Sequence, residues 1–171
     1  MHGYGDFSLT KGLKDKKVYV LENNTLKELT LNSGNSLDDS GDPGTYNYEA
    51  EDNLGRLKIF ESSKNEEKTF VIKYKLMDIV TKYTDVAAFN RKVVDTYWQT
   101  RLDNIKIKIT LPSGATKEEL KVFAHGPLEG ESSILDNSNV EFKVPSVSQY
   151  ISSNPVKLTI KIISKPLFKV S

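Results

Sequence analysis

The chain has 171 residues, and its 24 lysine and arginine residues almost balance its 23 aspartate and glutamate residues. Without a net basic field, a general role in nucleic-acid binding is disfavoured. There is no cysteine, which excludes disulfides, a thiolate nucleophile and a cysteine-bound zinc site. A chain of this length can form one compact core or two small ones.

The first residues, 1–13, carry no basic segment followed by a continuous apolar run, so we expect a linker-like start without a secretion signal. Residues 32–45 are rich in serine, glycine and aspartate and predict a solvated, flexible loop, which we call the Ser/Gly loop. Every apolar run falls short of the roughly 20 residues that span a bilayer as a helix.

Apolar and polar side chains alternate repeatedly along the chain, which is the pattern of strands with one buried face. Turn-forming residues, such as the pair Asn23 and Asn24, separate these segments. Residues 69–76 are expected to be a central strand, because Val71 makes the second face apolar as well. In chain order the predicted strands lie at residues 17–21, 26–31, 56–61, 69–76, 104–112, 120–124, 140–144 and 156–162.

This pattern predicts an all-β fold, an antiparallel β-sandwich of about eight strands that spans residues 1–171 as a single domain. The stretch 85–96 is the exception, because its alanine, arginine and lysine residues are tolerable helix formers. Val93 and Val94 disfavour a long helix there, so we expect at most one short helix.

Several short motifs follow one another in order. A T-F-x-I-x-Y strand is followed by a Y-x-D corner, a tryptophan, an N-I-K-I-K-I-T-L-P strand and H-G-P. Their order and spacing resemble the domain of unknown function 2207 family of predicted membrane proteins. The positions that carry the resemblance are Tyr74, Tyr83, Asp85, Trp98, Pro112, His125, Gly126 and Pro127.

The resemblance implies an all-β ectodomain of a bacterial membrane-anchored protein of uncharacterised function, at the extracellular face of the cell membrane. It implies a membrane anchor outside this sequence and no catalytic residues. An opening hairpin before Gly3 is also expected outside the sequence. Without that hairpin an edge strand is exposed, so we consider an edge-strand homodimer.

His125 is the centre of a hydrolase hypothesis, in which Asp85 orients the imidazole and Ser113 or Ser133 is the nucleophile. A histidine in a Gly-Pro turn more often hydrogen-bonds a local carbonyl or a core carboxylate. We therefore predict that the protein is not an enzyme, with no catalytic residues and no cofactor.

Asp38, Ser40, Asp42 and Glu49 have the relative spacing of oxygen ligands in a calcium loop. Pro43 stands where such a loop needs a glycine with positive φ, which excludes an EF-hand. A looser calcium site stays as an alternative to a solvated acidic loop, and we predict no metal site.

Aromatic side chains offer another kind of site. Trp98 could serve as a platform for a sugar ring or a peptide, but a large aromatic residue in a small β domain usually fills the core. Tyr46 and Tyr48 are the better candidates for surface aromatics.

Four lysines, Lys106, Lys108, Lys157 and Lys161, point outward from two predicted strands. If these strands share a sheet, the lysines form a basic stripe that could meet an anionic wall polymer or membrane surface. The simpler interpretation is that they keep a sheet face soluble.

The leading hypothesis is a non-enzymatic interaction or structural module whose partner is an unknown protein or cell-envelope component. The alternative is a carbohydrate or cell-wall binding module, and the weaker alternative is the hydrolase centred on His125. The interaction positions to examine are Tyr83, Asp85, Trp98 and His125.

Overall fold

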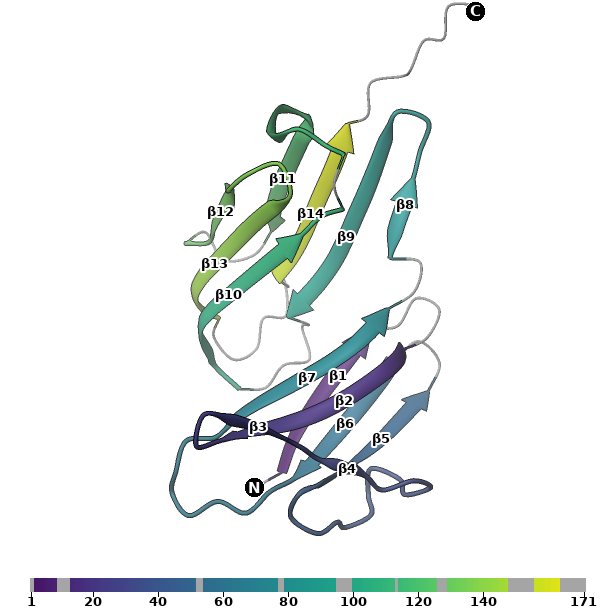
Figure 1. Cartoon of the computed structure of the whole chain (residues 1–171), viewed down its shortest axis with the longest axis vertical. Helices are drawn as coiled ribbons and strands as arrows, with labels where there is room; N and C mark the ends of the chain where they lie inside the picture. Colours follow the sequence, from purple (N-terminus) through teal and green to yellow (C-terminus); the bar gives the residue numbers. More distant parts are fainter. Residues whose placement is uncertain are drawn as a thin grey trace, which may run out of the picture. The chain divides into compact units, whose positions relative to one another are not determined.

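The computed structural model describes residues 2–8, 13–51, 54–76, 79–94, 100–112, 114–125, 129–147 and 156–163. In these residues the fold is all-β, as the sequence predicts, with fourteen strands and one 3-10 turn at Lys117–Glu119 (Figure 1). The strands group into two compact units, Met1–Asp78 and Ile79–Ser171, where the sequence pattern led us to expect one sandwich of about eight strands.

The first unit is a sandwich of two sheets. A four-stranded sheet has the order β1-β6-β5-β4, and a three-stranded sheet has the order β3-β2-β7. Val18 and Val20 from one sheet pack with Leu57 and Ile59 from the other. The strands are β1 (His2–Ser8), β2 (Leu13–Glu22), β3 (Thr25–Glu28), β4 (Thr30–Leu31), β5 (Thr45–Glu51), β6 (Leu54–Phe60) and β7 (Thr69–Leu76).

The β2–β3 hairpin confirms the predicted turn at Asn23 and Asn24. Both residues have positive φ, 47° and 62°, a conformation that asparagine tolerates better than most residues. Two successive residues of this kind match the right-handed twist of a two-residue hairpin. The local sequence therefore fixes the register of this hairpin.

Two segments of the first unit differ from the expectation. The beginning of the chain, expected to be linker-like, forms β1, which pairs with β6 from His2 opposite Phe60 to Ser8 opposite Leu54. Residues 69–76 form β7, but the prediction of a central strand is wrong, because β7 lies at a sheet edge. Its exposed lysines are typical of edge strands, where they discourage further pairing.

The Ser/Gly loop is irregular, as predicted, but buried polar side chains hold it. The fully buried Asn47 donates hydrogen bonds to the carbonyl oxygens of Ser36 at 2.7 Å and Asp39 at 3.2 Å. The Lys58 ammonium, also buried, donates to the carbonyl oxygens of Leu37 at 2.8 Å and Asp39 at 3.2 Å. These bonds attach the loop to β5 and β6.

The second unit is also a sandwich. One sheet has the order β11-β14-β9-β8 and the other has the order β10-β13-β12. Val140 and Phe142 of β13 pack with Phe89 of β9 and Val122 of β11, which closes the core between the sheets. The strands are β8 (Val80–Lys82), β9 (Val86–Val94), β10 (Leu102–Thr110), β11 (Leu120–His125), β12 (Glu131–Ile134), β13 (Asn139–Val147) and β14 (Val156–Ile163).

At most one short helix was expected within 85–96, and the described part of that stretch, residues 85–94, contains none. These residues form the turn before β9 and β9 itself, which pairs with β14 on one side and β8 on the other. Pairing satisfies the backbone on both sides, and Phe89 enters the core, so tertiary contacts override a weak helical propensity.

The described residues include no helix with the length and hydrophobicity needed to cross a bilayer.

Candidate functional site

Tyr83 and Asp85 lie in the tight turn that joins β8 to β9. The Tyr83 N–H donates a 2.7 Å hydrogen bond to the carbonyl oxygen of Val86, which closes the turn. Both side chains are exposed, and Tyr83 shows 56% of its surface to solvent. The Y-x-D corner is therefore a β-hairpin turn at the surface.

His125 is the exposed last residue of β11, where it stands opposite Lys157 of β14. Asp85 precedes Val86, which stands opposite Ile163 at the other end of β14. Lys157 and Ile163 are six residue steps apart along β14, which is roughly 20 Å at the usual rise per residue. The structure therefore does not bring Asp85 to His125, and the hydrolase arrangement is not assembled from this pair.

The other residues of that hypothesis give it no further support. Ser133 lies on β12, in the sheet that does not contain His125. Ser113 and the Gly126-Pro127 pair lie outside the described residues, as does Trp98. The choice between core and platform for Trp98 therefore stays a prediction.

The tyrosines predicted to be surface aromatics face inward, so that prediction is wrong. Tyr46 is only 4% exposed and belongs to the core of the first unit, and Tyr48 packs against the same core. The ammonium of Lys16 lies over the Tyr48 ring, 4.2 Å from its centre. The alternation on β5 places both tyrosines on the buried face.

The spacing that suggested a calcium loop does not produce a cluster of ligands. Among the residues that the structure describes, no three histidine, cysteine, aspartate or glutamate side chains gather to hold a metal ion. In the Ser/Gly loop the Asp39 carboxylate instead accepts the backbone N–H of Ser36 at 2.7 Å.

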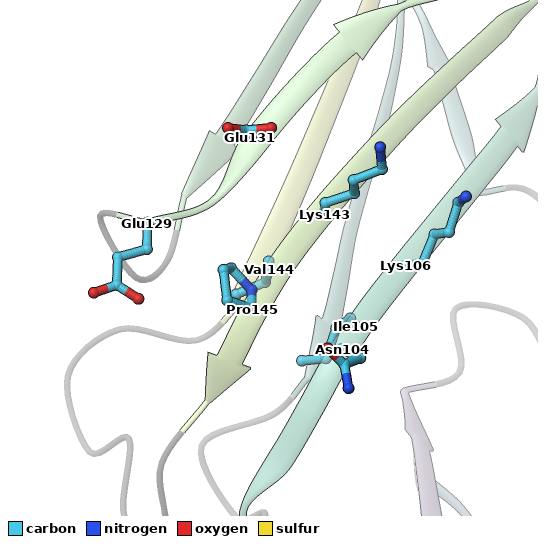
Figure 2. A pocket seen from close by; sticks show the side chains of 8 residues that line it. All are labelled: Asn104, Ile105, Lys106, Glu129, Glu131, Lys143, Val144 and Pro145. Atoms are coloured by element: carbon cyan, nitrogen blue, oxygen red, sulfur yellow. The ribbon is translucent and has the colours of Figure 1, made fainter.

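A hollow lies on the outer face of the β10-β13-β12 sheet, and we call it the charged groove (Figure 2). Its volume is about 400 Å³. β12 begins at Glu131, opposite Lys143, whereas β13 continues as far as Val147. The groove lies where β13 extends beyond the start of β12. Its lining residues are Asn104, Ile105, Lys106, Glu129, Glu131, Lys143, Val144 and Pro145.

A break in strand pairing lies in the groove. Asn104 has a positive φ of 56°, and the register places Pro145 across from it without a ladder pair between them. Proline has no N–H to donate, and asparagine tolerates the left-handed conformation. The ladder resumes at Ile105 opposite Val144. This interruption distinguishes the groove from the regular part of the sheet.

On the positive side of the groove, two lysines share one buried carboxylate, that of Glu141. Lys106 and Lys143 face each other across β10 and β13, where like charges repel. Glu141 lies beside both, with one oxygen 3.1 Å from the Lys106 ammonium and the other 3.0 Å from the Lys143 ammonium. The hydrogen bond from Lys143, and then that from Lys106, lowers the pKa of Glu141, and the hydrogen bond to Glu141 raises the pKa of Lys143.

The negative side is formed by two glutamates. Figure 2 shows Glu129 and Glu131 on one side of the groove and Lys106 and Lys143 on the other. Glu131 stands opposite Lys143 on the neighbouring strand, and its charge adds to the rise in the pKa of Lys143. Both glutamate side chains are exposed, and within the described residues Glu129 makes no ion pair. The groove therefore offers both signs of charge to one ligand.

The groove was not predicted from the sequence. A proline inside the alternating run of β13 and two glutamates separated by one residue were the available signals. Neither signal shows that β10, β12 and β13 lie side by side, because partner strands are not encoded locally. The groove therefore became visible only when these strands were assembled.

The four lysines predicted to form a stripe are divided between two sheets. Lys106 and Lys108 lie on β10, whereas Lys157 and Lys161 lie on β14. The condition for the predicted stripe, a shared sheet, is therefore not met.

Comparison with protein-family models shows that residues 6–152 match the family described as the N-terminal domain of predicted membrane protein DUF2207. No curated protein and no solved structure matches the chain.

Proposed function

The chain belongs to the DUF2207 family of predicted membrane proteins, and from this membership we propose that it is a non-enzymatic interaction or structural module at the extracellular face of a membrane. The charged groove is the observation that supports binding. Its lining carries two lysines and two glutamates beside Asn104, Ile105, Val144 and Pro145. These charges suit recognition.

The occupant that best fits the groove is a polypeptide segment of a partner protein that carries both an acidic and a basic side chain. An acidic side chain would lie toward Lys106 and Lys143, and a basic side chain toward Glu129 and Glu131. Complementary charges on both sides orient a ligand and exclude partners of the wrong polarity. Because the groove is open and solvated, we expect modest affinity and strong sensitivity to salt.

A photo-crosslinking residue placed at Glu129 in the whole membrane protein tests this assignment. We expect one defined adduct with a protein after irradiation of intact cells, and we expect protease to remove the captured partner. The same residue at Lys64, an exposed position in the first unit, is the control and should not give this adduct.

Charge reversal makes the experiment specific for the groove. Glu131→Lys should abolish the Glu129 adduct, and the matched reversal Glu67→Lys, at an exposed position of the first unit, should preserve it. A similar adduct from Lys64, or an adduct that survives Glu131→Lys, would contradict the groove as the binding site.

The proposed location can be tested because the chain has no cysteine. Lys64→Cys introduces an exposed thiol into the whole protein, and a membrane-impermeant maleimide should label it in intact cells, above the background of the unsubstituted protein. Labelling only after the cells are broken would place the domain on the cytoplasmic side.

A carbohydrate or cell-wall binding module is the second candidate, and the exposed Tyr83 at the β8–β9 turn is the feature that favours it. Sugar rings stack on exposed aromatic side chains, and Tyr83 presents such a ring. In the crosslinking experiment, an adduct that resists protease but is released by a wall-degrading enzyme would favour this function over a protein partner.

A second copy of the chain is a further partner that we propose, through the edge strand β1. In the described ladders β1 pairs with β6 and lies at the end of its sheet. An unpaired edge is a template for another strand. Sedimentation velocity should show dimers that increase with concentration, and a monomer at every concentration would exclude this mode.

A further inference from the structure

The β11-β14-β9-β8 sheet concentrates positive charge. Its four strands contain no aspartate or glutamate, although the whole chain has nearly equal numbers of acidic and basic residues. The other sheet of the same sandwich mixes both signs, with Glu131 and Glu141 beside its lysines. The basic residues of the four strands are Lys82, Arg91, Lys92, Lys121, Lys157 and Lys161.

One face of this sheet, which we call the basic face, carries the exposed side chains of Lys121, Phe123 and His125 from β11 and of Lys161 from β14. Strand alternation places the β11 residues on the side opposite Leu120, which is buried in the core. The basic face is therefore the outer surface of the sandwich.

Lys121 and Lys161 stand directly opposite each other on adjacent strands, where like charges repel. Lys106 and Lys143 face each other in the same way on the other sheet, but there Glu141 lies within 3.1 Å of both ammonium groups. Among the described residues no carboxylate takes that place between Lys121 and Lys161. An external anion would supply the missing countercharge.

The acidic residues that immediately precede β11 do not supply it. The Glu119 carboxylate accepts the backbone N–H of Thr116 at 2.9 Å and caps the 3-10 turn. A hydrogen bond from its own backbone N–H, followed by one from the Thr116 side chain, lowers the pKa of Glu118. Both carboxylates are thus engaged in the turn before β11.

Phe123 gives the basic face a second property. Its ring is 46% exposed, and the Lys161 ammonium lies 5.8 Å from the ring centre. Aromatic rings and lysines together are typical of surfaces that meet the membrane interface, because the ring enters the headgroup layer while the ammonium groups stay at the phosphates. A soluble polyanion would use the lysines but would gain little from the exposed ring.

We propose that the basic face docks on the surface of an anionic lipid bilayer, with Phe123 in the headgroup layer and Lys121 and Lys161 beside lipid phosphates. A chain of a membrane-protein family meets lipid at high effective concentration, so a weak docking surface suffices. The proposal holds on either side of the membrane and is independent of any occupant of the charged groove, so each can fail without the other.

Co-sedimentation of the 171-residue chain with lipid vesicles tests the proposal. We expect binding to phosphatidylcholine vesicles that contain about 30% phosphatidylglycerol, and little binding to phosphatidylcholine alone, because anionic lipid provides the attraction. Binding should weaken as salt is raised, since the face and the lipid interact across solvent.

The double substitution Lys121→Gln and Lys161→Gln should lower the partition coefficient by about thirty-fold, given the usual contribution of each lysine near an anionic surface. The matched control is Lys64→Gln with Lys108→Gln, which changes the net charge equally away from the basic face. Far-ultraviolet circular dichroism of each variant verifies that it is folded. The control should bind vesicles as the unsubstituted chain does.

Phe123→Ser separates a bilayer from a soluble polyanion. It should weaken vesicle binding and leave binding of soluble polyphosphate unchanged, because only the bilayer has an apolar layer to receive the ring. Three results would overturn the proposal: no preference for anionic vesicles, equal losses in the two double variants, or vesicle binding that Phe123→Ser does not change.

Discussion

The two units share a plan, a four-stranded sheet packed on a three-stranded sheet, but use their polar residues in opposite ways. In the first unit Asn47 and Lys58 are buried and bind carbonyl groups of the Ser/Gly loop. In the second unit Lys106, Lys121, Lys143 and Lys161 are exposed on the outer faces of the sheets, although Glu141, which lies between two of them, is buried. A buried polar group must be satisfied and therefore fixes a conformation, whereas an exposed charge stays available for a partner.

The largest effect is expected for a substitution in the core of the second unit. Phe142 is 1% exposed, and Phe142→Ala should lower the free energy of unfolding by about 3–5 kcal/mol through lost burial and a cavity. Phe123→Ala is the matched control, because the Phe123 side chain is about half exposed, and it should cost far less, about 1 kcal/mol. Urea denaturation measures both, and equal losses would contradict the assignment of Phe142 to the core.

The next effect concerns the polar network of the first unit. Asn47→Ala removes the buried donor to the backbone carbonyl oxygens of Ser36 and Asp39, which should cost about 1–3 kcal/mol. Hydrogen exchange in the Ser/Gly loop should accelerate. Asn35→Ala, at an exposed position of the same loop, is the control. Unchanged exchange after Asn47→Ala would show that the network does not hold the loop.

A smaller effect concerns the paired charges of the charged groove. The pKa of Glu141 lies below its ordinary value of 4.5, so its ionised form stabilises the folded state. This contribution is complete above about pH 4.5 and is lost as the pH falls through the lower pKa of the folded state. Glu141→Gln should therefore flatten the acid decline in stability, measured by denaturation between about pH 6 and pH 3. The exposed Glu67→Gln should leave that decline unchanged, and identical profiles for the two variants would contradict the pairing.

The smallest effect compares the two outer faces of the second unit. Lys161→Gln relieves repulsion with Lys121, so the melting temperature should stay constant or rise slightly. The corresponding change in the free energy of unfolding should stay within about 0.5 kcal/mol. Lys143→Gln should lower the melting temperature, because Glu141 loses a partner. The difference should shrink in high salt. A loss of stability in Lys161→Gln would contradict a net repulsion between Lys121 and Lys161.

The sequence predicted strands where one face is consistently apolar. The alternation of isoleucine and lysine over 104–112 became β10, and the run 156–162 became β14. It did not reveal β1, where glycines weaken the pattern, or β12, which is short and mostly polar. Strands of this kind are held by their neighbours and by little in their own composition.

Candidate sites were harder to predict than strands. A local turn holds Tyr83 near Asp85, whereas His125 and Asp85 share a sheet and still lie at its opposite ends. Alternation alone did not show which face of β5 is buried, and Tyr46, predicted to lie at the surface, belongs to the core. Residues close in sequence can be placed from local rules, whereas distant residues need the strand order.

The sequence by itself determined the all-β class, the left-handed asparagine turn after β2 and the alternating faces of the strongest strands, because these depend on local sterics and burial. The tertiary structure decided that β10 and β14 belong to different sheets. As a result Glu141 lies between Lys106 and Lys143, whereas within the described residues no carboxylate lies between Lys121 and Lys161. Side-chain alternation specifies which face of a strand is buried but not which strand lies beside it. Strand order is set by packing between residues far apart in the chain.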